Sequence, residues 1–166
     1  MLTRVNKYDK SGMDLYKGNT AEKNFTDILS GHGYIVSDST INENKFAHID
    51  KKITKDGKTY TVDVKSLKHR FKAHGWILAE FVGKYNSPGW MYGKSDLISF
   101  ELNQDEILLV SRLEFVKLVE SLVKDEYVKF VEQTLYKKCR RDQGDVYGHI
   151  TYDDLKTIKT MIIKRK

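Results

Sequence analysis

The chain has few of the residues that cross-link or interrupt a fold: one cysteine and one proline in 166 residues. A single cysteine, Cys139, excludes an internal disulfide and a cysteine-rich zinc site, and no histidine or cysteine pair has zinc-ligand spacing. The sequence also lacks the glycine-rich phosphate loops of dinucleotide-binding and P-loop proteins. These absences exclude several common enzyme classes and favour a protein of a reducing compartment.

Long apolar runs are absent as well. No stretch approaches the roughly eighteen apolar residues that cross a membrane, and the N-terminal segment has no apolar run resembling a signal peptide. Because 40% of the residues are hydrophobic and 31% are charged, a disordered chain is also excluded. We therefore predict a cytoplasmic protein without a membrane partner, located in the host cytoplasm if a phage encodes it.

Positive charge is what the sequence has in excess. A net charge of +6 favours a polyanionic partner, and nucleic acid, DNA in particular, is the partner we expect. Arg140 and Arg141 are adjacent in a glycine-containing loop, where contact with nucleic acid and simple exposure to solvent are equally good interpretations. The candidate nucleic-acid-binding residues are Lys68, His69, Arg70, Lys94, Arg140 and Arg141.

Apolar periodicity and turn residues predict an α/β fold with a central mixed β-sheet flanked by helices. We expect one domain over residues 1–166, with a loosely ordered lead-in over 1–18, a core over about 19–124 and a C-terminal extension over about 125–166. The expected helices cover residues 19–31 and 113–122 and open again at Thr151, and the expected strands cover 34–36, 46–54, 59–66, 76–82, 97–100, 107–110 and 146–150.

The clearest local pattern is a hairpin whose two strands are joined by Asp56-Gly57, a dipeptide typical of two-residue turns. With that turn, facing residues have numbers that sum to 113, so Asp50 lies opposite Asp63. Strand alternation then places Lys65 on the same face as Asp63. The other face is predicted to be apolar and carries Ile49, Ile53, Tyr60, Val62 and Val64.

Two carboxylates that face each other on a sheet repel, and a divalent cation would compensate that repulsion. Hard oxygen ligands suit Mg²⁺, for which Mn²⁺ can substitute. A nearby Lys65 can polarise a water or stabilise charge that develops on a phosphate. The alternative is the solvated face of an ordinary surface hairpin, on which Lys65 pairs with Asp63.

The order of Glu22 on a helix, then His48-Ile49-Asp50, then Val62-Asp63-Val64-Lys65-Ser66 resembles the PD-(D/E)xK nuclease superfamily. Ile49 stands where that family has proline. From Asp63 to Asp96 the chain is similar to small phage-type or Holliday junction resolvase-like members. The resemblance implies a restriction-endonuclease-like α-β-β-β-α-β core.

The resemblance also implies residue roles. Asp50, Asp63 and the Val64 carbonyl would bind Mg²⁺, Lys65 would position water, and Glu22 or Glu80 would assist. For Glu22 the alternative is a capping box with Asn19, and for Glu80 it is exposure at a sheet edge.

The expected function is therefore that of a metal-dependent nuclease that hydrolyses phosphodiester bonds of DNA, as an endonuclease or a structure-selective, resolvase-like enzyme. The alternative is a non-catalytic nucleic-acid-binding module with a nuclease-like fold. Since many resolvase-like members are dimers, the resemblance allows a homodimer. The choice between DNA and RNA, and between endonuclease and exonuclease, stays open.

Overall fold

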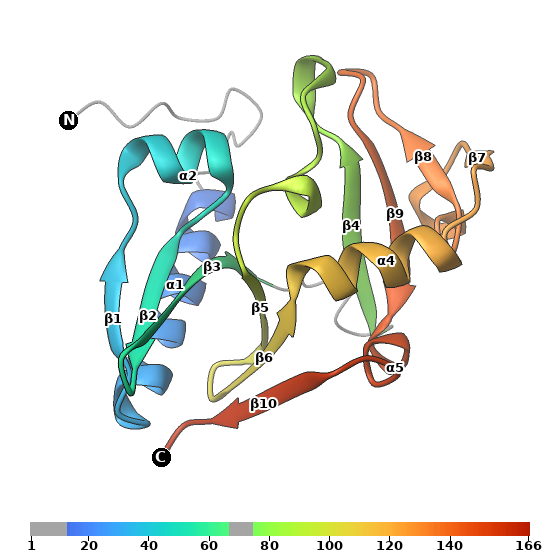
Figure 1. The fold of residues 1–166 in the computed structure, drawn as a ribbon. Coiled ribbons are helices and arrows are strands. Elements are labelled where there is room, and N and C mark those ends of the chain that lie inside the picture. The colour runs from blue at the N-terminus through green and yellow to red at the C-terminus, as the bar shows by residue number, and fades with distance from the viewer. Residues whose placement is uncertain (1–12, 67–74) are drawn as a thin grey trace.

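The computed structural model describes residues 13–66 and 75–166, which form two β-sheets and several helices (Figure 1). The larger sheet has the order β1 (Ile35–Asp38), β2 (Lys51–Lys55), β3 (Lys58–Lys65), β5 (Leu97–Asn103), β6 (Glu106–Ser111) and β10 (Thr160–Lys164). The smaller sheet has the order β4 (Trp76–Val82), β9 (Val146–Thr151), β8 (Lys138–Arg140) and β7 (Tyr127–Val128). The helices are α1 (Met13–Gly31), α2 (Ile41–Ala47), α4 (Arg112–Leu122) and α5 (Tyr152–Leu155), with single 3-10 turns η1 (Lys84–Asn86), η2 (Trp90–Tyr92) and η3 (Val131–Gln133).

The larger sheet is mixed, because β3 and β5 run parallel while its other neighbouring strands run antiparallel. The expected α/β class with a central mixed sheet flanked by helices is confirmed. The first described elements in chain order are α1, β1, α2, β2 and β3, so a short helix interrupts the α-β-β-β order that the resemblance implies. No helix in the described part of the chain is long and apolar enough to cross a membrane.

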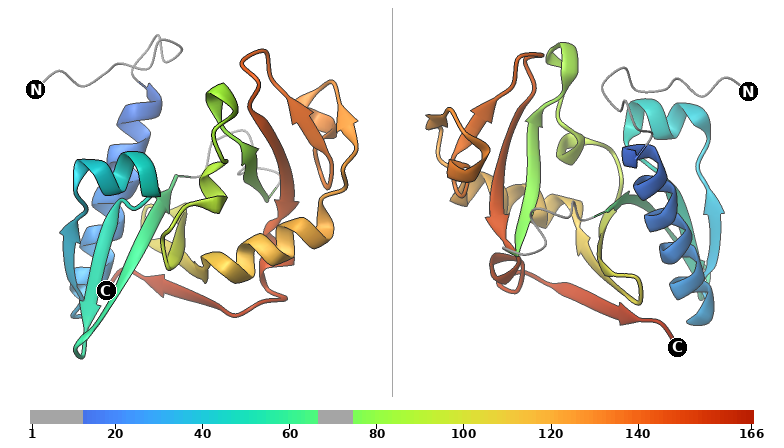
Figure 2. Two further views of the ribbon diagram at one scale, coloured as in Figure 1. Left: turned by 45° about the horizontal axis from the view of Figure 1, so that its top comes forward. Right: turned by 180° about the vertical axis from the view of Figure 1, so that it is seen from behind.

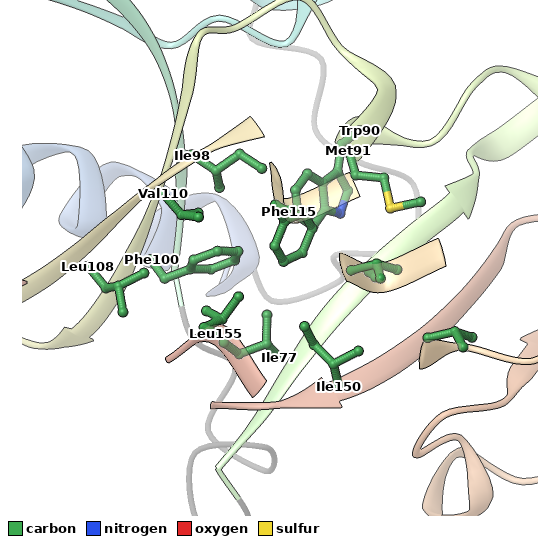
Figure 3. Packing of buried hydrophobic residues seen from close by; sticks show 13 residues of the cluster. Ile77, Trp90, Met91, Ile98, Phe100, Leu108, Val110, Phe115, Ile150 and Leu155 are labelled. Atoms are coloured by element: carbon green, nitrogen blue, oxygen red, sulfur yellow. The ribbon is translucent and has the colours of Figure 1, made fainter. Parts of the chain in front are cut away.

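Both faces of the larger sheet are covered. On one face α1 contributes Phe25, Ile28 and Leu29, which pack against Ile53 and Val62. On the other face lies a second core, built from β5, β6, α4 and the smaller sheet (Figures 2 and 3). A β3 side chain that points toward this second core is therefore removed from solvent.

Three aromatic rings from different elements hold the second core together. The Trp90 ring stacks on Phe115 of α4 with ring centroids 5.7 Å apart, and Phe115 lies 5.4 Å from the ring of Phe100 on β5. Figure 3 shows these rings between Ile98 on β5 and Ile77 on β4. Trp90 is thus a packed residue, and it joins the smaller sheet to the larger one.

The hairpin of β2 and β3 has the predicted register. Asp56 and Gly57 both have positive φ, at 51° and 74°, as a two-residue type I′ turn requires. Lys51 pairs with Val62 and Lys55 pairs with Lys58, so facing residues sum to 113. The apolar face is also present, with Ile53 and Val62 buried beneath α1, although Tyr60 near the turn is exposed.

The expected start of the first helix is wrong. Helix α1 begins at Met13, six positions before Asn19, so residues 13–18 are helical and are no loose lead-in. Asn19 and Glu22 lie inside the helix and form no capping box. Gly18 costs a helix only about 1 kcal/mol relative to alanine, which does not end a helix whose next turn buries Ala21.

The strand predicted over 46–54 is wrong in its first half. Helix α2 occupies Ile41–Ala47, and β2 begins only at Lys51. Thr40 and Glu43 form a complete capping box at the start of α2, and His48 ends it in a left-handed conformation. This local capping outweighs the alternating pattern that suggested a strand.

The C-terminal third belongs to both sheets and is no appended extension. Strand β9 pairs with β4 in the smaller sheet, and β10, which the sequence pattern missed, pairs with β6 in the larger one. The last helix opens at Thr151 with the expected cap from Asp154, but α5 is only four residues long. The apolar residues after α4 form β7 and η3 and do not continue the helix.

Gly89 provides a test of how the two sheets are joined. A Cβ there would lie 1.8 Å from the backbone oxygen of Glu80, so the chain that leads into Trp90 can approach β4 only with glycine. We expect Gly89→Ala to lower the free energy of unfolding by roughly 3 kcal/mol, measured by urea denaturation. Gly18→Ala, in open space within α1, should instead raise it by up to about 1 kcal/mol. Equal stability of the Gly89 variant and the wild type would contradict this packing.

Candidate active site

Asp63 is the most unusual charged residue in the described part of the chain. It lies on β3 facing the second core, and only 1% of its surface is exposed. Lys65 Nζ lies 2.6 Å from Asp63 Oδ1, yet no donor of the described residues makes a well-directed hydrogen bond to either carboxylate oxygen. Because buried polar groups are normally hydrogen-bonded, this carboxylate marks a candidate site.

Asp50 precedes β2 and is fixed in place by the strand opposite. Its backbone N–H donates to the Val62 carbonyl at 2.9 Å. Val62 is the register partner of Lys51, so the predicted register does not continue to Asp50. Its carboxylate accepts a 2.7 Å hydrogen bond from the Val64 N–H and a 2.6 Å hydrogen bond from Asn44 Nδ2. The Asp50 side chain is thus anchored to β3, and it acts to raise the pKa of the Asp63 carboxyl, although the strand pairing does not place the two residues directly opposite each other.

The surroundings of Asp63 shift its acidity strongly. Burial, with a smaller contribution from the nearby Asp50, raises the pKa of the Asp63 carboxyl to about 7, and the ammonium of Lys65 opposes this shift. Two carboxyl groups that approach in a desolvated place favour retention of a proton. In the absence of a cation, Asp63 is therefore partly protonated near neutral pH.

Lys65 connects the hairpin to the smaller sheet. Its Nζ lies 4.8 Å from the centre of the Trp90 ring, and the backbone N–H of Trp90 donates to Glu80 Oε1 at 3.2 Å. Burial raises the pKa of Glu80, while Lys65 acts to lower it, which places that ammonium close to the carboxylate. A pocket of about 280 Å³ opens here, lined by Lys65, Ser66, Trp76, Glu80 and Trp90 among others.

Glu22 lies elsewhere. Its carboxylate is 3.1 Å from Lys51 Nζ, which also contacts Asp38. Lys51 pairs with Val62 and shares the face of the sheet that α1 covers, opposite to the face of Asp63. The structure therefore brings Glu80 to the pocket that Lys65 lines and leaves Glu22 on the other face of the sheet. Within the described residues, neither glutamate joins Asp50 and Asp63 in a cluster of three carboxylates. The sequence signal for Glu22 was its order along the chain, which does not determine the face of a helix.

The remaining candidates are scattered. Lys94 is exposed at the end of the η2 segment, and its backbone N–H donates to the Ala47 carbonyl. Arg140 and Arg141 line a separate pocket beside the smaller sheet. Lys68, His69 and Arg70 lie outside the described residues. Asn44 was missed, and only the Thr40–Glu43 capping box could have placed it on a helix beside the hairpin.

His48 ends α2 in a left-handed conformation, two residues before Asp50. It is half-buried, and desolvation lowers the pKa of its imidazole, with Lys65 acting in the same direction and Asp50 against it. A neutral imidazole at this position adds no further positive charge to the site.

The donor set limits which metal ion could be held. Within residues 13–66 and 75–166, no three or more acidic, histidine or cysteine side chains gather as a complete metal-binding cluster. Two carboxylates suffice for Mg²⁺, which keeps several of its waters, but not for a closed zinc site. The unpartnered oxygens of Asp63 and the fixed carboxylate of Asp50 fit such a cation.

Comparison of the chain with models of protein families, with curated proteins and with solved structures finds no match. The assignment of a function depends on the geometry of these residues.

The raised pKa of Asp63 predicts how stability depends on pH. Between pH 4 and pH 7 the folded protein binds a proton that the unfolded chain releases, so the free energy of unfolding falls as pH rises through this window. Asp63→Asn removes this penalty. In EDTA at pH 8 the variant should be more stable than the wild type by about 2–4 kcal/mol, and near pH 4 the two should be alike.

Urea denaturation at pH 4, 6 and 8 measures this difference. The exposed Asp142→Asn serves as a matched control and should follow the wild type at each pH. A stability difference that does not change with pH would show that Asp63 ionises normally.

Proposed function

We propose that this protein is a metal-dependent nuclease of the PD-(D/E)xK type that hydrolyses phosphodiester bonds, with DNA as its substrate. One observation carries the proposal: the carboxylate of Asp63 is buried beside Asp50 and Lys65, and no donor of the described residues makes a well-directed hydrogen bond to it. Burying an unpartnered carboxylate costs several kcal/mol unless something compensates it. A bound divalent cation would compensate both aspartates at once.

Each residue of the candidate site has a separate role in such a reaction. Asp50 and Asp63 hold the cation, and the Val64 N–H and Asn44 keep the Asp50 carboxylate in one orientation. When bound, Mg²⁺ lowers the pKa of a water and neutralises charge on the phosphate. The ammonium of Lys65, between Asp63 and Trp90, orients the attacking water and stabilises negative charge at the phosphate.

Glu80 is the proposed proton acceptor. Burial raises the pKa of its carboxyl, which brings it closer to the range in which a carboxylate accepts a proton at neutral pH. Its Oε1 is fixed by the Trp90 N–H, and the pocket that it shares with Lys65 admits solvent. The proton lost by the water that Lys65 orients therefore has an acceptor in Glu80 on β4.

The competing interpretations explain less. A solvated hairpin face does not fit a residue that is 1% exposed. A nucleic-acid-binding module without catalysis needs basic residues, but it needs no pair of facing carboxylates, which repel phosphate. Metal dependence separates this alternative from a nuclease.

The test is cleavage of plasmid, linear and branched DNA, and of RNA, in Mg²⁺, Mn²⁺ or EDTA. We expect metal-dependent cleavage that falls by about 100-fold or more in Asp63→Asn, Asp50→Asn and Lys65→Met, because each removes a ligand or a charge from the reacting centre. Calorimetric titration should show Mn²⁺ binding to the wild type and none to Asp63→Asn.

Two glutamates provide a matched comparison. Glu80→Gln should reduce cleavage strongly, whereas Glu22→Gln should cleave like the wild type, since Glu22 contacts Lys51 on the other face. If no nucleic acid is cut in either metal, or if Asp63→Asn and Lys65→Met cut as well as the wild type, the nuclease proposal fails.

A further inference from the structure

A second pocket, of about 440 Å³, lies beside the smaller sheet. Four of its lining residues are basic and two are acidic, and the lining includes Lys84, Lys129, Arg140, Arg141, Asp142, Gln143, Asp145 and Tyr147. No acidic side chain of the described residues lies within ion-pair distance of Lys129 or Arg140. Arg141 differs, because its Nη1 lies 3.7 Å from Asp145 Oδ2. The pocket therefore keeps positive charge mainly at Lys129 and Arg140.

The two arginines are held in place before any ligand arrives. The Arg141 guanidinium lies 4.4 Å from the centre of the Tyr147 ring, and that of Arg140 lies 5.7 Å from the centre of the Tyr127 ring. Arg140 also donates from Nη1 to the Gly144 carbonyl. A guanidinium laid on an aromatic ring keeps its N–H edge for hydrogen bonds to an anion, and its planar fork matches the oxygens of a phosphate.

The tip of the β4 hairpin stands next to this pocket. Val82 and Pro88 form a bridge, and the Ser87 N–H donates to the Lys84 carbonyl across a tight turn. Tyr85 and Asn86 in its centre both have positive φ, at 57° and 59°. Asn86 Oδ1 lies close to Gly144 of the loop between β8 and β9, and Figures 1 and 2 show these two loops side by side.

Tyr85 is exposed to an unusual degree. Its side chain is 90% accessible, although a bulky residue at positive φ costs about 1–2 kcal/mol of backbone strain. Contacts with the rest of the protein do not offset that strain, so packing does not explain why an aromatic ring is at this position. An exposed ring beside a basic pocket matches the stacking platforms that bind unpaired bases.

The pocket is also close to the proposed active site. Glu80, which lines the pocket at Lys65, is the strand-pairing partner of Tyr147 on β9, which lines the second pocket. We propose that the Arg140–Arg141 pocket binds a backbone phosphate of an unpaired nucleic-acid segment while Tyr85 stacks on one of its bases. This rests on the proposed nuclease function and makes its substrate a strand with unpaired nucleotides, such as a flap, an overhang or a junction.

Binding without metal tests this separately from cleavage. Fluorescence anisotropy in EDTA would use a labelled oligothymidine of about fifteen nucleotides, its RNA equivalent and a blunt duplex of the same length. We expect the single strands to bind more tightly than the duplex. Tyr85→Asn should weaken single-strand binding about tenfold and Tyr85→Phe should not, because base stacking needs only the ring.

Asparagine tolerates the left-handed backbone, so Tyr85→Asn should unfold at the same urea concentration as the wild type or a higher one. Arg140→Gln should weaken binding several-fold and reduce the slope of log affinity against log salt by about 1. Lys58→Gln, which removes a charge at the far tip of the β2–β3 hairpin, should change affinity by less than about twofold.

The outcomes separate the two proposals. Four results would each overturn the pocket proposal, whatever the cleavage assay shows. They are wild-type affinity in both Tyr85→Asn and Arg140→Gln, equal weakening by Lys58→Gln, preference for the duplex, and no binding at all. Single-strand binding that depends on Tyr85 and Arg140, in a protein that cuts nothing with metal, would uphold the pocket and refute the nuclease.

Discussion

The carboxylate of Asp63 is buried at a place from which it cannot turn toward solvent. Strand β3 has β2 on one side and β5 on the other, α1 packs on one face and the second core covers the other. A charge at such a place is costly, and only the ammonium of Lys65 partly offsets it within the described residues. The anchoring of Asp50 on β3 and the position of Lys65 over Trp90 arrange the neighbours around that one group.

The hairpin part of the site was predictable because its determinants are local. The Asp56-Gly57 turn sets the register, and the register together with strand alternation sets the face of Asp63 and Lys65. Asp50 lies beyond the last register pair, and its carboxylate is positioned by the Val64 N–H and Asn44. Glu80 was only a candidate, because its position depends on the packing of a second sheet against the first. That packing requires Gly89 to approach β4 and the Trp90 ring to enter the core, which no local pattern specifies.

Other elements escaped prediction for different reasons. Strand β10 joins β6 across a separation of about fifty residues, and β9 joins β4 across about seventy, so nothing near either strand identifies its partner. Helix α2 has a complete capping signal, but the alternating residues after it suggested an earlier strand. In the case of Glu22, the extension of α1 to Met13 and the Lys51 ion pair place the side chain on the face away from Asp63.

The distribution of charge separates binding from chemistry. Asp50 and Asp63 form an acidic centre that by itself repels a phosphodiester, although the chain as a whole carries +6. On the proposed interpretation, a cation at the aspartates reverses the sign of that centre, and the arginines beyond Glu80 attract the strand whether or not the cation is bound. Affinity for nucleic acid then depends on salt and hydrolysis depends on metal. Because two different sets of residues control them, each can be removed by mutation while the other remains.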